Sequence, residues 1–298
     1  MREREIERVN KYKDYLHFFF CSFFLFLNKF KIFNFLNKKL LDVYLINSGY
    51  CINWNYLLSK SNNNLFLGEN IFIKKFEKLN IKNCIDIGAN IGDFSLEILK
   101  NKSTKVIAFE PLPKCCDKLS LIYKEYGNRF KFFEIALSNK DGFSKLNYGE
   151  TTSGLSSLET KINKIPYVGD SNTNSIEVIT KQLDSFINDL EFQNTDFVKI
   201  DVEGHEMGVL DGALDFIKKN HIKLIQIEFN WHNLLTKNTI YDYSVMLEGY
   251  VVTQLNLING KLRIINPLDP LSNLYFLSNF IFIEKIFFEK YKKIIIED

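Results

Sequence analysis

The chain has 298 residues and a formal net charge of +2, and 46% of its residues are hydrophobic. An apolar fraction this large supports a sizeable core and excludes an intrinsically disordered protein. A charge this close to balance does not predict a nucleic-acid groove, which needs a concentrated basic face.

Residues 1–80 are predicted to form an aromatic and basic helical extension before the main domain. After a charged head, LHFFFCSFFLFL at 16–27 is roughly half as long as the ~20 residues that a membrane span requires. Residues 28–45 then alternate apolar pairs with lysine at helical spacing. Two interpretations stay open: a basic amphipathic segment on the inner face of a membrane, or a helical lid packed on the main domain.

From residue 81 onward, short apolar runs alternate with longer helical stretches. The pattern predicts strands at 83–89, 105–111 and 130–138, and helices at 94–101 and 114–127. Such an alternation is typical of a parallel sheet with helices on both faces.

A polar insertion at 139–195, rich in Ser, Thr, Asn and Gly, interrupts this alternation. Within it, 143–149 and 175–180 could add edge strands to the sheet. A helix is expected at 183–190, with Asp184 or Ser185 as its N-cap.

The alternation resumes after the insertion and ends in a hairpin and a tail. An Asn-Gly pair at 259–260 favours a tight turn between two strands. The main domain is expected to cover 81–280. The remaining elements are predicted as strand 196–202, helix 205–220, strand 222–229, a hairpin of 250–257 with 261–265, a closing strand at 273–278, and an amphipathic C-terminal helix at 281–298.

The run CIDIGANIGDFS at 84–95 places a glycine loop between a strand and a helix. Gly88 can adopt backbone angles that other residues avoid, and Gly92 would let a polar ligand approach the helix N-terminus. A dinucleotide site needs a further glycine where Asn90 stands. The spacing therefore disfavours an NAD-type oxidoreductase and favours a smaller ligand.

Two acidic residues indicate what that ligand is. Asp86 suits an ammonium better than a phosphate, and Glu110 lies about 22 residues past Gly88, at the distance of an acid that bonds ribose hydroxyls. An amine, a carboxylate and a ribose together describe S-adenosylmethionine.

The block DFVKIDVEGHEMGVL at 196–210 follows an apolar strand, so its acidic residues lie at the sheet edge where ligands bind in open α/β folds. Asp201 could orient the substrate, bind a divalent ion or act as the base. His205 could be a general base or make a structural hydrogen bond. Glu203 would bind substrate hydroxyls or fix the loop, whereas Glu206 is expected to start a helix.

Two further candidates follow the next strand. Glu228 could contact the substrate, or join Asp201 as an oxygen ligand for Mg²⁺. The block contains no consecutive acidic pair, so no metal site is predicted. Trp231 could stack on a sugar ring or pack as an ordinary aromatic residue.

These residues resemble the FkbM-type S-adenosylmethionine-dependent methyltransferases, with matches in family order over roughly 84–256. The most specific match is the KIDVEGHE block with the VLDGA that follows it. The matching segments are DIGANIGDFS (86–95), AFEP (108–111), ALSNKDG (136–142), SSL (156–158), TKQLDSF (180–186), DFVKIDVEGHEMGVLDGA (196–213) and IQIEFN (225–230).

The resemblance implies a class I Rossmann-like methyltransferase, an α/β fold with a seven-stranded, mostly parallel sheet whose last strand is antiparallel. By position, Asp86, Gly88, Asn90 and Gly92 would surround the methionine part of S-adenosylmethionine. Glu110, with Pro111 beside it, would hold the ribose. The segment from Ala136 to Ser138 would flank the adenine, and Asp201 would lie near the reacting methyl. At Glu134 the sequence departs from the family, which often carries Asn there.

The leading hypothesis is a cytoplasmic O-methyltransferase acting on a sugar hydroxyl in a glycan or glycoconjugate. Asp201, His205 and Glu203 are its expected catalytic residues, and Glu228 and Trp231 its expected substrate-binding residues. The cytoplasmic expectation rests on the 5 cysteines, which include no CxxC pair and predict neither a disulfide framework nor a zinc site. The alternatives are a non-sugar natural-product acceptor and a catalytically silent partner that keeps the cofactor-binding fold.

Overall fold

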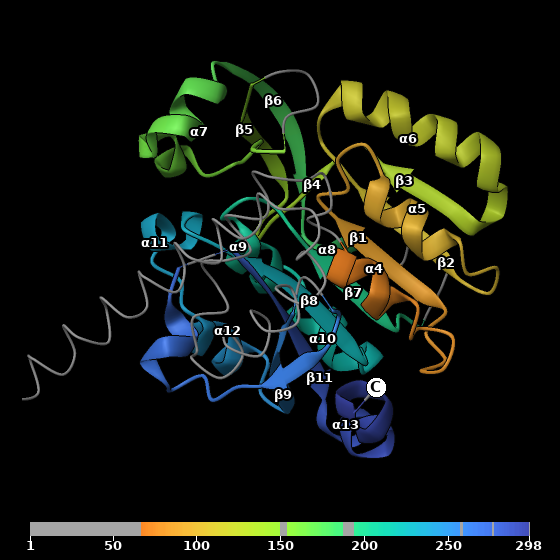
Figure 1. The fold of residues 1–298 in the computed structure, drawn as a ribbon. Coiled ribbons are helices and arrows are strands. Elements are labelled where there is room, and N and C mark those ends of the chain that lie inside the picture. The colour runs from red at the N-terminus through yellow and green to blue at the C-terminus, as the bar shows by residue number, and fades with distance from the viewer. Residues whose placement is uncertain (1–66, 150–153, 187–193, 257–258, 276, 298) are drawn as a thin grey trace, which may run out of the picture. The chain divides into compact units, whose positions relative to one another are not determined.

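The computed structural model describes residues 67–149, 154–186, 194–256, 259–275 and 277–297 (Figure 1). All of them belong to one compact unit, Asn55–Asp298. The amphipathic stretch at 16–45, and with it the choice between a membrane contact and a lid, lies outside the described residues.

The centre of the unit is an eight-stranded sheet with the strand order β10-β9-β11-β8-β7-β1-β2-β3 (Figure 1). The last strand in the chain, β11, runs antiparallel to its neighbours β8 and β9. The predicted seven-stranded sheet with an antiparallel last strand is confirmed, and β10 extends it as an additional edge strand. The strands are β1 (Asn83–Ile87), β2 (Lys105–Phe109), β3 (Phe130–Phe133), β7 (Phe197–Ile200), β8 (Leu224–Phe229), β9 (Tyr250–Leu255), β10 (Leu262–Ile264) and β11 (Ser278–Glu284).

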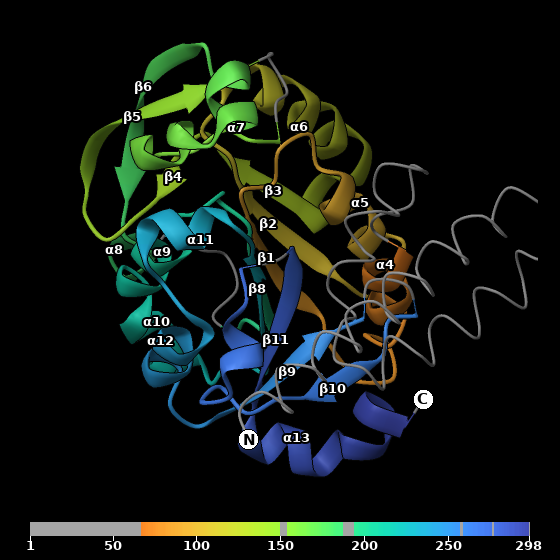
Figure 2. The ribbon, with the colours of Figure 1, turned by 60° about the vertical axis from the view of Figure 1, so that its left-hand side comes forward.

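Helices cover both faces of this sheet and bury a separate apolar core on each (Figure 2). Along β1, Cys84 packs into the first core and Ile85 into the second, as the alternation of side chains in a strand requires. The first face carries α4 (Leu67–Ile73), α5 (Asp93–Leu99), α6 (Pro113–Tyr126) and α13 (Lys285–Lys292); the second carries α8 (Leu183–Phe186), α9 (Glu206–Asp211), α10 (Leu214–Asn220) and α12 (Ile240–Met246).

Residues 67–80, expected at the end of the N-terminal extension, contribute to the first core. Phe72, Phe76 and Leu79 are fully buried there. The Phe76 ring lies 4.9 Å from that of Phe197 on β7. The packed domain therefore begins before residue 81.

The polar insertion folds around a second sheet of three strands, in the order β4-β6-β5. This sheet consists of β4 (Ala136–Leu137), β5 (Gly142–Tyr148) and β6 (Asn174–Lys181). The strand predicted at 130–138 is therefore wrong as one element, because its two halves belong to different sheets. Glu134 stands between the two halves, but the apolar residues on both sides of it favour a single strand.

The predicted helix at 205–220 is in fact two helices, α9 and α10, that meet at Gly212. A Cβ at Gly212 would lie 2.0 Å from the carbonyl oxygen of Ser138, so the chain bends at a point of close backbone approach. Asp184, predicted as the cap of its own helix, instead accepts hydrogen bonds from the backbone N–H groups of Asp215 and Phe216 at the start of α10.

The C-terminal prediction is also corrected. The closing strand is not at 273–278; it occupies Ser278–Glu284, and α13 begins only at Lys285. Both faces of β11 are covered, so its side chains are apolar on both sides and the run reads like a helix. Within the described part of the chain, no helix has the length and apolar character needed to cross a bilayer.

Candidate active site

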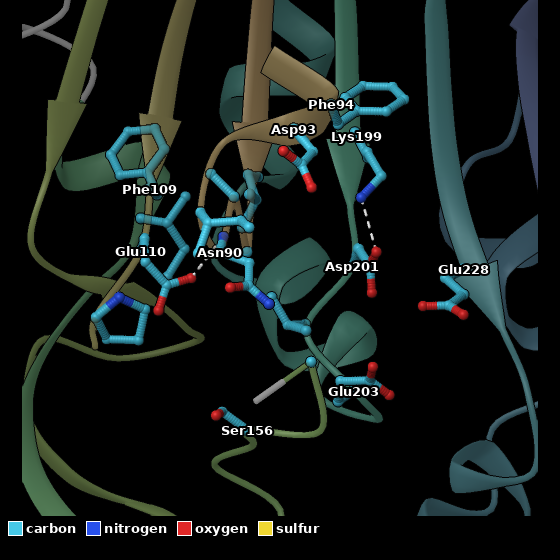
Figure 3. Close-up of a pocket in the computed structure, with 18 of the residues that line it drawn as sticks. Asn90, Asp93, Phe94, Phe109, Glu110, Ser156, Lys199, Asp201, Glu203 and Glu228 are labelled. Carbon is cyan, nitrogen blue, oxygen red and sulfur yellow. Dashed lines mark hydrogen bonds and ion pairs between the residues drawn. The ribbon is translucent and has the colours of Figure 1, made fainter. Parts of the chain in front are cut away.

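A cavity of about 720 Å³ lies at the carboxyl ends of the central strands (Figure 3). Glu110, which follows β2, lines one end; Asp201, which follows β7, lines the middle; Glu228 on β8 lines the other end. Three strand spacings separate β2 from β8, which corresponds to about 14 Å. The cavity therefore extends across the carboxyl ends of four neighbouring strands, β2, β1, β7 and β8.

The glycine loop after β1 forms the first end of the cavity. Gly88 has a φ of 81°, and a Cβ there would lie 1.8 Å from the carbonyl oxygen of Asp201, so the position requires glycine. Asn90 also adopts a left-handed conformation, with a φ of 50°. Its backbone N–H donates to Glu110 Oε2 at 2.9 Å, and that of Leu112 donates to Oε1 at 2.9 Å. Burial raises the pKa of Glu110 to about 7.

Five of the eight predicted cofactor residues line this cavity: Gly88, Asn90, Glu110, Pro111 and Ala136.

The other three, Asp86, Gly92 and Ser138, do not line it. The space beside Gly92 is filled by side chains of α6, so this glycine serves helix packing. Asp86 is fully buried behind the loop, where Ser95 Oγ donates to its Oδ2 at 2.6 Å. Its Oδ1 has no hydrogen-bond partner among the described residues, and burial raises the pKa of the carboxyl group.

His205 lines the cavity, but both of its ring nitrogens are engaged. Nε2 lies 2.9 Å from Ser138 Oγ, and Nδ1 lies 2.8 Å from Glu159 Oε1. The ring also fills the space beside Gly208, where a Cβ would lie 2.5 Å from Nε2. His205 therefore ties the insertion to the start of α9, which favours the structural hydrogen bond over the general base.

Asp201 is the carboxylate at the centre of the cavity. Lys199 Nζ donates to its Oδ2 at 2.7 Å, and the lysine side chain is only 7% exposed (Figure 3). Burial opposes the ionisation of Asp201, but Lys199 and a hydrogen bond with Glu228 outweigh it and lower the pKa. At Glu228, burial and the charges of Asp201 and Glu203 raise the pKa well above its ordinary value. Lys199 therefore favours the ionised form of Asp201, whereas burial and the neighbouring carboxylates disfavour that of Glu228.

Glu203 and Glu206 play different parts in the same loop. Glu203 lines the cavity, and its Oε2 lies 2.7 Å from Nδ1 of the buried His232. Glu206 does not line it; its Oε1 accepts from the backbone N–H groups of Gly204 at 2.8 Å and Val202 at 3.3 Å. Glu206 therefore fixes the loop at the start of α9, as expected of a structural residue.

One oxygen from each of Asp201, Glu203 and Glu228 lies within 4.8 Å of the others. Lys199 Nζ binds one oxygen of Asp201, and His232 Nδ1 lies 2.7 Å from one oxygen of Glu203. Among the described residues, these three carboxylates are therefore the group that could supply oxygen ligands to a divalent cation.

Trp231 does not line the cavity. Its ring packs edge to face with Tyr167 at a centroid distance of 5.9 Å. The sugar-stacking interpretation is not supported by this position, whereas Glu228 does line the cavity as expected of a substrate-binding residue.

Some cavity residues were missed from the sequence: Glu69 on α4, Phe94 on α5, Lys199 on β7 and Asn279 on β11. Lys199 carried a usable signal, because a lysine in an otherwise apolar buried strand needs a charged partner. Glu69 and Asn279 lie in segments without a motif, so only the three-dimensional structure brings them to the site.

The sheet order, the glycine loop and the carboxylates at the strand ends define a class I Rossmann-like methyltransferase. A family model described as Methyltransferase FkbM domain matches residues 86–244, over half of the chain. The chain therefore belongs to the FkbM methyltransferase family.

Two fungal proteins show similarity in sequence. Methyltransferase sdnD of Sordaria araneosa is 29% identical over 166 residues, which is 48% of this chain and 62% of that protein. Methyltransferase 1 of Beauveria bassiana (strain ARSEF 2860) is 27% identical over 144 residues, 44% of this chain and 58% of that protein. The chain thus spans about three fifths of each relative.

Among solved structures, the chain is similar to the SAH-bound Podospora anserina methyltransferase PaMTH1. The two share 11% identity over 72% of this chain and 76% of that one, with a TM-score of 0.39. This likeness is too weak to support a functional conclusion.

Proposed function

We propose that the protein is an S-adenosylmethionine-dependent O-methyltransferase whose acceptor is a hydroxyl of a sugar in a glycan or glycoconjugate. The observation that carries the proposal is one cavity with two differently built ends. A carboxylate held by two backbone N–H groups stands at one end, and Asp201, paired with Lys199, stands with Glu228 at the other. Membership of a methyltransferase family supports the reaction class.

The first end of the cavity fits the cofactor. Each oxygen of Glu110 accepts one backbone hydrogen bond, and a carboxylate has about four acceptor positions, so two remain for ribose hydroxyls. Phe109, Ala136 and Leu137 add an apolar wall suited to a purine. When bound there, S-adenosylmethionine supplies the methyl group on a sulfonium that is already a good leaving group.

At the acceptor end, Asp201 is the group placed to handle the hydroxyl. Its ionised carboxylate accepts a hydrogen bond from the acceptor O–H and so aligns the oxygen for in-line displacement. Loss of the hydroxyl proton completes the transfer, and Asp201 is the ionised base within reach. Because its pKa is lowered, Asp201 is a weak base and releases the proton readily to solvent.

The proposal is tested by incubating the protein with methyl-labelled S-adenosylmethionine and glycan fractions of the source cell. We expect label in a glycan, and at least about a 100-fold loss of transfer in Asp201→Asn, the scale of a lost proton acceptor. If the label appears in a non-sugar product instead, the acceptor is not a sugar. Cofactor binding without transfer to any fraction would identify a catalytically silent protein.

A further inference from the structure

The far end of the cavity is built partly from segments outside the family-matched residues 86–244. Helix α4 contributes Glu69, and β11 contributes Asn279. Asn279 pairs in register with Glu228, and their strands β11 and β8 lie three and two strands beyond β1, where the glycine loop begins. These residues therefore stand on the side of Asp201 that faces away from Glu110.

Glu69 lies above a row of polar side chains that crosses the sheet. In register, Asp86 pairs with Lys199 and Lys199 pairs with Gln226, on β1, β7 and β8. Gln226 Nε2 donates a hydrogen bond to Glu69 Oε1, and it also lies 3.2 Å from Asn279 Oδ1. Glu69 thus joins the row at its β8 end, beside the acceptor half of the cavity.

The position of the Glu69 carboxyl group is energetically unfavourable, because the group is buried with few hydrogen-bond donors. The residue is 2% exposed, and among the described residues its side chain has one hydrogen-bond donor, the neutral amide of Gln226. Burial raises its pKa to about 7, although the charge of Lys199 acts in the opposite direction. A glutamine or an apolar residue could occupy the same position in α4 with a smaller desolvation penalty. A carboxyl group kept in such a place within a cleft indicates a binding role.

We propose that Glu69 binds the acceptor by accepting a hydrogen bond from a second hydroxyl, one that is not methylated. This inference rests on the proposed function and adds the acceptor class: a polyol that presents no anionic group at this end. Carboxylate oxygens accept hydrogen bonds, so Glu69 favours an acceptor that presents a hydroxyl donor. A phosphate or carboxylate on the acceptor would place a second acidic group beside Glu69, whose one donor among the described residues is the neutral amide of Gln226.

The test compares Glu69→Gln with Glu77→Gln, which makes the same charge change on an exposed residue of the same segment. Titration calorimetry with S-adenosylmethionine should give equal Kd values for the wild type and both variants, within about twofold. Methyl transfer to the glycan fraction should need about tenfold more fraction for half-saturation in Glu69→Gln, with a smaller change in maximal rate. Glu77→Gln should match the wild type in both measurements.

The second arm needs no turnover. Protein loaded with S-adenosylhomocysteine is dialysed against the same fraction, and the retained molecules are identified by mass spectrometry. We expect the wild type to retain a neutral glycan and Glu69→Gln to lose it. If Glu69→Gln does not fold, Glu69→Asp replaces it, because it keeps the charge but withdraws the carboxyl group by one methylene.

Several outcomes would overturn the inference. These are equal retention by wild type and variant, a loss of cofactor binding in the variant, or no retention by the wild type. If the wild type retains a glycan but transfers no methyl group, the proposed function fails while the Glu69 inference is still decided by the dialysis.

Discussion

Replacing Lys199 by Met should destabilise the protein strongly. The lysine lies in a strand buried on both faces, its side chain is 7% exposed, and its ammonium lies 2.7 Å from Asp201 and 4.8 Å from the Phe94 ring centre. Methionine keeps the length of the side chain but leaves Asp201, and the neighbouring Asp86, without the cation. Breaking a buried ion pair on one side costs about 3–5 kcal/mol, because the remaining charge is buried without compensation.

Urea unfolding followed by tryptophan fluorescence measures this cost. The matched control is Lys181→Met, which breaks a 3.0 Å pair with Asp141 in which both side chains are 39% exposed. That variant should lose less than about 1 kcal/mol. The double variant Lys199→Met/Asp201→Asn should recover part of the loss of Lys199→Met. An equal loss in Lys199→Met and the control would refute the view that Lys199 keeps Asp201 ionised.

Three further predictions concern the site. Wild-type affinity for S-adenosylmethionine should fall as the pH drops below about 7, because Glu110, with a pKa raised to about 7, is then protonated and accepts fewer hydrogen bonds. Calorimetry should show weaker binding and no such pH dependence in Glu110→Gln; an unchanged profile would contradict the ribose role. Gly88→Ala should lose more than about 2 kcal/mol in thermal unfolding, since its Cβ would lie 1.8 Å from a backbone oxygen, whereas Gly127→Ala, with no atom within 4 Å, should lose less. His205→Gln should slow methyl transfer less than Asp201→Asn does, and it should leave the shape of the pH–rate profile unchanged. If the variant loses the ascending limb of that profile, His205 is the base.

Local patterns predicted the first half of the site. The strand, turn and helix around Gly88 and Asn90 form from adjacent residues, and Glu110 follows the next strand, so alternation alone brings them to one edge. The order of the main sheet follows from the same alternation and from the family resemblance.

Pairings between distant segments could not be predicted in this way. The partner of His205 is Glu159, which the insertion supplies, and the partner of Lys199 depends on where β7 ends. Asp86 and Ser138 lie next to the loops that line the cavity but are held by other side chains: Ser95 Oγ donates to Asp86, and Ser138 Oγ lies 2.9 Å from His205 Nε2. Glu69 lies on α4, and the hydrophobic periodicity of the sequence does not indicate that this helix packs next to β8.

The central claim is that the end of the cavity at Glu110 binds S-adenosylmethionine. Titration of the folded wild-type protein with S-adenosylmethionine at pH 8 tests it most directly. We predict saturable binding, with a Kd well below about 1 mM and one site per chain. A folded sample that shows no binding at concentrations on the order of 1 mM would contradict the account.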